Sequence, residues 1–235
     1  GPHLVVGVDP INAEFVALAI AKRVGGVVLP TLYMGTERER SPEVLKSLGL
    51  NEDSYIVGMD FPSAKGLYKS FYFPEELFAL TVRGHIELCL EHGYKYVYIV
   101  NGHGAVNHNE VLKRLCVEFS NKIEGVKVDF AVTFPQKMVE EGAIAHAGVE
   151  ETSLMMYFNR EWVDLDRLPP RDKKLKYKEY SIVDGQGFIG NPGEGHAVPD
   201  NLDPRSMSTE EQGRELFENT VKELENHVRK MFQIA

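Results

Sequence analysis

A nearly all-apolar run, Tyr96–Val100, ends in the turn Asn101-Gly102-His103-Gly104 and is followed by a helical pattern over Asn107–Lys122. A strand without polar alternation is typical of a parallel strand that is covered on both faces. Parallel strands need long crossover connections, which are usually helices. This feature restricts the chain to an α/β architecture more strongly than any other in the sequence.

The rest of the chain repeats the alternation of strands and helices. Apolar runs predict two further buried strands, Val27–Tyr33 and Val126–Val132. Helical spacing and end signals predict helices over residues 10–24, 43–50, 74–91, 148–158 and 208–232, with a polar loop at 35–42 and an irregular stretch at 160–204. We therefore expect one α/β domain over residues 1–235, with three α/β/α layers and a mainly parallel sheet.

Composition excludes several classes of function. The 235 residues carry a net charge of −9, which argues against a general binder of nucleic acid or of anionic membranes, since both need a basic surface. The longest apolar stretch, around Val97–Val100, is too short to span a bilayer. Cys89 and Cys116 fit buried thiols in a reducing compartment better than a disulfide, so we expect a cytoplasmic protein.

In open α/β folds, ligands bind at one edge of the sheet, beyond the carboxyl ends of the strands. Three polar segments are candidates for a binding site at that edge. They are residues 1–9, which end at Asp9, the His103 turn, and the segment His146–Ser153 with Glu151. Each also has a structural explanation. Asp9 is a good N-cap for the first helix, a turn histidine can be structural, and Glu151 can favour a helix dipole.

Taken together, Asp, His and Glu side chains form a mixed donor set that suits borderline divalent ions such as Zn²⁺, Mn²⁺ or Fe²⁺. Three protein ligands with open positions would suit an ion that activates water. We interpret His85, His92 and His227 as structural or surface residues, while His108 and His196 stay undecided.

These segments resemble the creatininase family, which includes creatinine amidohydrolases and related formamide hydrolases. The His103 turn is similar to the family's Asn-Gly-His-Gly-Gly-Asn motif, and residues 146–153 resemble its His-Ala-Gly-x-x-Glu-Thr-Ser motif. Gly1-Pro2-His3-Leu4 with Asp9 resembles the second half of Glu-x-His-Gly-Pro-His-Leu-Pro-x-x-x-Asp. The match spans nearly the whole chain.

The resemblance implies a role for each matching residue. Asp9 would bridge metals, His103 would ligate one, and Glu151 would be a ligand or a water-activating carboxylate. His146 would contact the substrate or transfer protons, and His3 would line the substrate pocket. The resemblance also implies one or two divalent ions and a homo-oligomer such as a hexamer.

The chain departs from the family pattern at three places. The family's Glu-x-His ligands would stand immediately before Gly1, so we expect the natural protein to carry them upstream, together with the first strand of the sheet. Ala105-Val106 replaces a carboxylate of creatininases proper, which disfavours creatinine as the substrate. At Tyr68 and Lys69 many members have a Gly-Thr-Ile-Ser segment that shapes the pocket, and these residues suggest contacts to a polar or anionic substrate.

We therefore predict a metal-dependent hydrolase that uses metal-activated water on a carbonyl of a small cyclic amide or formamide. The same chemistry would open a cyclic diketone of the inosose type by cleaving a carbon–carbon bond. A peptide-maturation protein and a metal-free binding module on the same fold remain alternatives. The expected partners are a small-molecule substrate and further copies of the chain, without nucleic acid or membrane.

Overall fold

The two strands of a parallel ladder, β1 (Tyr96–Asn101) and β2 (Lys127–Val132), pair from Tyr96 opposite Lys127 to Asn101 opposite Val132. The crossover between them is the helix α4 (Val106–Lys122), as the sequence predicts. The computed structural model describes residues 1–37, 71–140, 146–178, 181–182 and 196–233. The predicted helix over 43–50, and Tyr68 and Lys69, lie outside these residues.

The chain divides into two compact units, and each is described by itself. Within the described ranges, the first unit contains Gly1–Val8 and Gln136–Glu218. The second contains Asp9–Arg38, Phe71–Pro135 and Asn219–Ala235. The expectation of a single domain stays a prediction.

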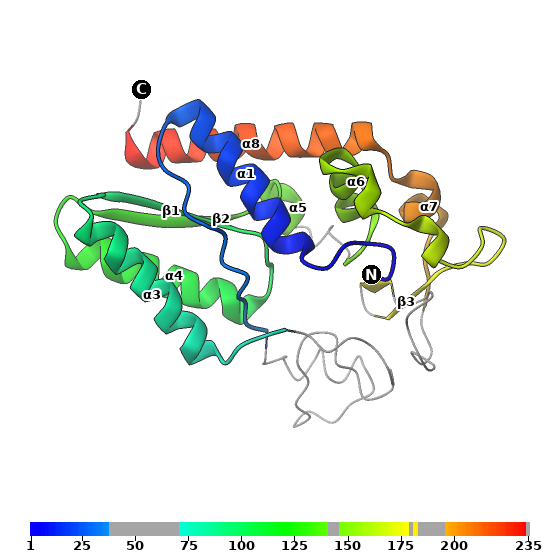
Figure 1. Ribbon diagram of the computed structural model, residues 1–235, viewed down its shortest axis with the longest axis horizontal. Helices are drawn as coiled ribbons and strands as arrows, with labels where there is room; N and C mark the ends of the chain where they lie inside the picture. Colours follow the sequence, from blue (N-terminus) through cyan, green and yellow to red (C-terminus); the bar gives the residue numbers. More distant parts are fainter. Residues whose placement is uncertain (38–70, 141–145, 179–180, 183–195, 234–235) are drawn as a thin grey trace. The chain divides into compact units, whose positions relative to one another are not determined.

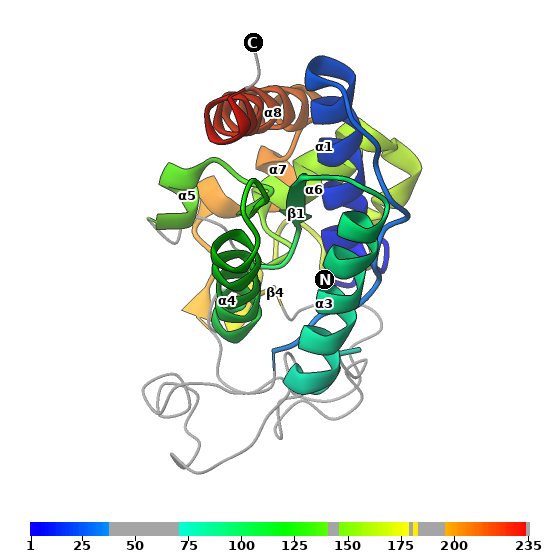
Figure 2. The same cartoon turned by 90° about the vertical axis from the view of Figure 1, so that its left-hand side faces the viewer.

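The second unit is built on β1 and β2. Its helices are α1 (Val8–Val24), α3 (Glu75–Glu91), α4 and the last part of α8 (Glu210–Phe232). Helices α3 and α4 lie on one face of the two strands, and α8 lies on the other (Figures 1 and 2). The face beneath α3 and α4 forms a continuous apolar core with buried residues Phe78, Val82, Ile86, Val111, Leu112, Leu115, Cys116, Phe119, Val126 and Val128.

The strand pair is less buried than predicted. Tyr96 is half-exposed, and the inner residues of β1 are only partly covered. On the α8 side, Phe232 stacks on Tyr96 with ring centroids 4.9 Å apart. His227 contacts Asp129 of β2 at 2.7 Å. Among the described residues, the two faces of β1 are therefore only partly covered.

The predicted strand over Val27–Tyr33 is wrong. The described chain from Gly25 to Met34 forms no ladder, and Val27 and Tyr33 are 65% and 67% exposed. Only Gly35, further on, forms an isolated parallel bridge, with Tyr72. An apolar run has strand propensity, but only a hydrogen-bonded neighbour turns it into a strand.

The first unit starts with two turns, one on each side of an isolated bridge at Leu4. Leu4 forms an antiparallel bridge with Val163, and Val5 donates its N–H to the carbonyl oxygen of Trp162 at 3.1 Å. The helix α6 (Val149–Phe158) is buried on all sides from Thr152 to Met156, and the buried residues include the polar Thr152 and Ser153. Its predicted position is confirmed.

The stretch 160–204, predicted as irregular, contains short elements. They are η1 (Arg160–Trp162), η2 (Leu165–Arg167), η3 (Asp200–Leu202) and an antiparallel sheet in the order β4-β3-β5, with β3 (Lys176–Lys178), β4 (Ser181–Ile182) and β5 (His196–Ala197). The unit also contains α5 (Gln136–Glu140), α7 (Pro204–Met207) and the start of α8. Elements of two to five residues give no periodic signal, so sequence reasoning missed them.

Buried Arg205 fixes this stretch. Its guanidinium donates hydrogen bonds to Asp203 and to the carbonyl oxygens of Pro169, Pro170 and Lys173. These partners satisfy a charge that would otherwise be costly to bury, and they hold together segments without long regular elements.

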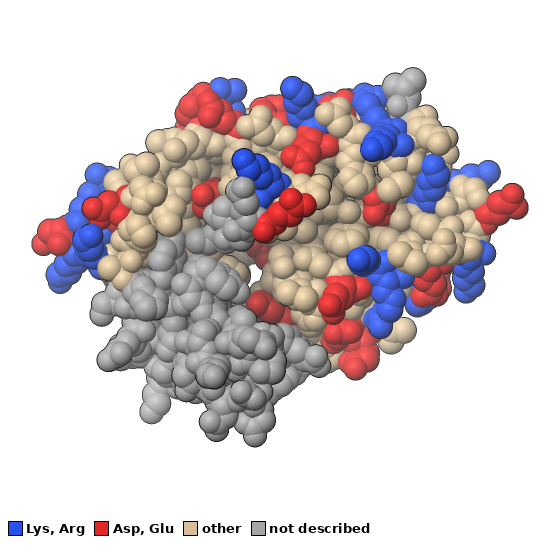
Figure 3. Space-filling view, turned by 180° about the vertical axis from the view of Figure 1, so that it is seen from behind, with Lys and Arg blue, Asp and Glu red and all other residues tan. Residues whose placement is uncertain are grey.

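The described surface carries charges of both signs. On the face in Figure 3, Lys and Arg are interspersed with Asp and Glu, without a continuous basic patch among the described residues. None of the described helices is long and apolar enough to cross a membrane.

Candidate active site

The turn after β1 is shaped by two asparagines. Asn101 accepts the N–H of His103 at 2.9 Å, and its amide nitrogen donates to the carbonyl oxygen of His103 at 2.6 Å and to Asn109 at 2.8 Å. Asn109, in the first turns of α4, donates in turn to the carbonyl oxygen of Gly104. Beyond the end of the ladder between β1 and β2, these side-chain hydrogen bonds take the place of backbone pairing. They hold the His103 turn in one conformation.

Gly102 permits the close approach of this turn to α1. A Cβ atom at Gly102 would lie 2.0 Å from the backbone oxygen of Asp9. On the same side, Asn12 donates to Thr133, which follows β2, at 2.8 Å. The first turns of α1 are therefore fastened to the carboxyl ends of both strands, which is where the sequence predicts the site.

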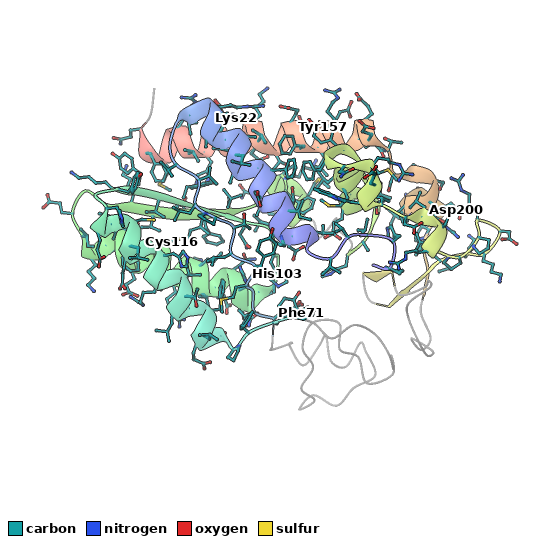
Figure 4. All side chains as sticks on the ribbon, viewed as in Figure 1. Lys22, Phe71, His103, Cys116, Tyr157 and Asp200 are labelled. Atoms are coloured by element: carbon teal, nitrogen blue, oxygen red, sulfur yellow. The ribbon has the colours of Figure 1, made fainter. Side chains whose placement is uncertain are left out.

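His103 and Asp9 meet as expected from the motif order. Nδ1 of His103 lies 3.0 Å from Oδ2 of Asp9, and Figure 4 shows the labelled His103 near the first turns of α1. Asp9 lies inside the first turn of α1, so the predicted N-cap role is wrong. The helix starts at Val8 instead of Pro10, and the Asp9 carboxylate faces the imidazole of His103.

The other ring nitrogen of His103 faces a second acid. His103 is 8% exposed, and its Nε2 makes no hydrogen bond in the described structure. Oε2 of Glu37, which is also 8% exposed, lies 3.8 Å away. Burial would lower the pKa of His103, but the hydrogen bond to Asp9 and the charges of Asp9 and Glu37 raise it above its ordinary value.

Two aromatic rings enclose this imidazole. Tyr72 lies against it with ring centroids 5.0 Å apart, and His108 approaches it edge-on at 5.1 Å. Buried His108 accepts the N–H of Thr36 at Nδ1 and packs on Phe78. Burial, together with the charge on His103, lowers the pKa of His108 to about 3, so His108 is a neutral positioning residue.

The second motif lies in the first unit. Oε2 of Glu151 accepts the N–H of Ala147 at 2.6 Å, across the start of α6. Ala147 has a φ of 54°, in the left-handed region that non-glycine residues rarely adopt. His146 and Glu151 are both half-buried. Backbone strain of this kind gathers at functional sites, where the surroundings hold it in place.

His3 is the most deeply buried of the predicted site residues. It is 1% exposed, and its Nε2 lies 2.9 Å from Oγ1 of Thr152, the neighbour of Glu151 in α6. Burial lowers the pKa of His3 to about 3. The resemblance assigns His3 to the pocket lining, and the structure places it beside the motif that contains Glu151.

The predicted residues thus fall into two sets. Asp9 and His103 lie together in the second unit, and His3, His146 and Glu151 lie in the first. Sequence reasoning missed Glu37, Tyr72 and the positioning role of His108. For Glu37, the available signal was its place at the end of an apolar segment, which parallels the place of His103 after β1.

Comparison with known proteins identifies the chain. A family model described as creatinine amidohydrolase matches residues 1–228. The chain belongs to the creatininase family. Since the members are amidohydrolases, the chain is a hydrolase, and a small amide is the general class of its substrate.

The similar proteins support this assignment over the whole chain. The creatinine amidohydrolase of Pseudomonas putida is 25% identical over 252 residues, covering 99% of this chain and 85% of the relative. The structure of a mutant creatininase, in which one tryptophan is replaced by phenylalanine, has a TM-score of 0.65 at 25% identity, covering 99% of this chain and 86% of that one. A manganese creatininase gives a TM-score of 0.64 at 22% identity, with 99% and 86% coverage. The predicted α/β fold of creatininase type is confirmed.

The donor chemistry around His103 fits a divalent ion on one side of the ring. Within the part of the chain that the structure describes, no group of three His, Cys, Asp or Glu side chains is placed to hold an ion. The buried Nε2 of His103, without a hydrogen bond, is nevertheless a nitrogen donor of the kind that Zn²⁺ and Mn²⁺ accept.

Proposed function

We propose that this chain is a metal-dependent amidohydrolase that acts on a small cyclic amide or formamide. The observation behind the proposal is the buried His103, which has a carboxylate at Nδ1 and no hydrogen bond at Nε2. A carboxylate at one nitrogen fixes the tautomer in which the other nitrogen keeps its lone pair for a metal. Similar creatininases have been solved in a Zn–Zn form and a manganese form, which supports the choice of ion.

When bound, a divalent ion would lower the pKa of a water molecule and polarise the carbonyl group of the substrate. His103 would hold the ion through Nε2, and Asp9 would orient His103 or bind an ion itself. Tyr72 would offer an aromatic face beside the reacting group. Burial around His103 would exclude bulk water and strengthen each polar contact.

Residues of the second motif, His146–Ser153, would carry out the proton transfers. Glu151, with His146 as the alternative, would accept a proton from the attacking water and return it to the leaving nitrogen. Glu150, the neighbour of Glu151, has a pKa raised by burial, but we assign it no step. His3, Tyr68 and Lys69 remain the predicted substrate contacts. A cytoplasmic location and a homo-oligomer such as a hexamer are further parts of the proposal.

The experiment uses protein loaded with Zn²⁺ or Mn²⁺ and a panel of lactams, formamides and cyclic diketones. Products are identified by mass spectrometry in ¹⁸O-labelled water, and one labelled oxygen is expected in the acid formed. Chelation should abolish turnover. If only the cyclic diketones are hydrolysed, the reaction is ring opening by cleavage of a carbon–carbon bond, and the amide proposal is wrong. Turnover that survives removal of all metal would overturn the metal mechanism.

A matched pair of variants tests the proton step. Glu151→Gln should lower kcat by about 10²–10⁴-fold, the usual contribution of a general acid–base group. Glu150→Gln changes the next residue in the same helical turn and should leave kcat within a small factor of the wild type. Equal losses in the two variants would show a structural effect of this turn instead of proton transfer by Glu151.

A further inference from the structure

A row of exposed apolar residues runs along α3. Leu77, Leu80 and Leu88 are 44%, 64% and 53% exposed, although the opposite side of the same helix is buried in the apolar core. Together with Gly84 they are spaced by three or four residues, which places them on one face of a helix. Figure 2 shows α4 beside α3 and no described element on the side that points away from α4. Contiguous exposed apolar surface, unlike a single exposed residue, is a feature of interaction sites.

Gly84 stands in the middle of this row. A Cβ atom at Gly84 would meet nothing within 4 Å, so no contact within the described chain requires a glycine there. A glycine inside a helix is destabilising relative to alanine, but it allows another backbone to approach closely. The position of Gly84 among exposed leucines is therefore suited to a second helix that packs against α3 from outside.

The row matches itself when a second copy of α3 runs in the opposite direction. Leu80 and Leu88 lie four residues before and four residues after Gly84. If two copies of the helix meet antiparallel at Gly84, Leu80 of each copy lies at the level of Leu88 of the other. A dimer with two-fold symmetry needs a surface that is complementary to itself in this way.

The charges beside the row match in the same arrangement. Arg83 and Glu87 are four residues apart and lie on one side of the row. Two-fold symmetry about Gly84 brings Arg83 of each copy to within about 3 Å, along the helix axis, of the level of Glu87 of the other. Arg83 also forms an ion pair with Glu118 of α4, which holds its side chain beside the row and leaves it 31% exposed. A guanidinium has five N–H donors, so it can bind a second carboxylate.

From these observations we propose that α3 is a contact face between two copies of this chain, which pair antiparallel about Gly84. The inference rests on the homo-oligomer of the proposed function and names the face through which copies meet. One face of a helix about 25 Å long is smaller than the roughly 800 Å² per partner of a standard interface. We therefore expect a reversible contact that dissociates on dilution.

The test is sedimentation equilibrium of the purified chain over a wide range of concentrations. Leu80→Lys/Leu88→Lys places like charges opposite each other across the axis and should weaken association by about a hundredfold or more. Leu80→Glu/Leu88→Lys places opposite charges there and should recover much of the affinity. The two positions are about 12 Å apart along one helix, so a difference between these double variants reports pairing between copies. The first variant also reduces the net charge of −9, so general repulsion would change in the opposite direction.

Val117→Lys is the matched control, because Val117 on α4 is 53% exposed, as is Leu88. It should associate like the wild type. Gly84→Ala should weaken association, since two methyl groups at the axis push the helices apart, although alanine strengthens the helix of each protomer. Circular dichroism shows whether each variant is folded.

The outcomes separate this inference from the proposed function. Association of Leu80→Lys/Leu88→Lys with wild-type affinity, or equal losses in the two double variants, would overturn the contact face. Copies would then meet elsewhere, and the amidohydrolase proposal would stand. A wild type that stays monomeric at every concentration would overturn the contact face and the homo-oligomer together, without affecting the proposed hydrolysis.

Discussion

Nδ1 of His103 lies 3.0 Å from Oδ2 of Asp9, although 94 positions separate the two residues in the chain. The imidazole is buried, while the Asp9 side chain is 38% exposed. A carboxylate placed in this way sets the tautomer and the direction of a histidine, which leaves the other nitrogen available to a metal. The contact brings together two motifs whose proximity the sequence could only suggest.

Asp9→Asn tests this relationship. An amide keeps the shape but loses the charge that favours Nδ1–H, so affinity for Zn²⁺ or Mn²⁺ should fall by about 10–100-fold. Calorimetric titration gives the affinity and the number of ions bound. A loss of one whole ion, with the other bound normally, would instead support the bridging role that the resemblance implies for Asp9.

Gly102→Ala and Gly104→Ala change the two glycines on either side of His103. A Cβ at Gly102 would lie 2.0 Å from the backbone oxygen of Asp9, whereas one at Gly104 would meet nothing within 4 Å. Gly102→Ala should push the His103 turn away from α1 and weaken metal binding by about tenfold or more. Gly104→Ala should bind like the wild type, and a comparable loss in both variants would contradict the close-approach explanation.

Gly213→Ala and Gly84→Ala form a second pair, this time for stability. A Cβ at Gly213, in α8, would lie 2.0 Å from the backbone oxygen of Ser153 in α6, so overpacking should cost about 1–3 kcal/mol. A Cβ at Gly84, in α3, would meet nothing within 4 Å, and alanine there should stabilise the helix by about 0.5–1 kcal/mol. Urea unfolding measures both, and the opposite signs are the expected result.

The pH dependence of stability should report buried His3. Burial lowers the pKa of His3 to about 3, while the unfolded chain has a histidine pKa near 6.5. Above about pH 6.5 His3 is neutral in both states and has no effect. As the pH falls from there toward 3, only the unfolded chain gains the proton, so the free energy of unfolding decreases by up to about 1.4 kcal/mol per pH unit.

His3→Gln should remove this contribution while an amide can still bond Thr152. Urea unfolding at pH 7 and pH 5 measures the slope, and His92→Gln, at an exposed histidine, is the matched control. The explanation is wrong if His3→Gln loses as much stability as the wild type between these two pH values.

Local signals in the sequence predicted the regular elements well. The helices α1, α3, α4, α6 and α8 and the strands β1 and β2 begin or end within a few residues of their expected positions. Periodicity, glycines and apolar runs act within one element, so they can be read without knowing the fold. The prediction of a strand at Val27–Tyr33 failed because a strand forms only where a neighbouring strand pairs with it. A local signal does not show whether such a neighbour is present.

By itself, the sequence determined the α/β class, the family motifs and the candidates Asp9, His103, His146 and Glu151. Only the tertiary structure decided which atoms face each other. It placed Asp9 at Nδ1 of His103 and Glu37 near Nε2, and it surrounded the ring with Tyr72 and His108. The reason is physical: burial and orientation of a side chain depend on contacts from distant segments, and the position of Glu37 at the end of an apolar segment does not specify which atoms it will face.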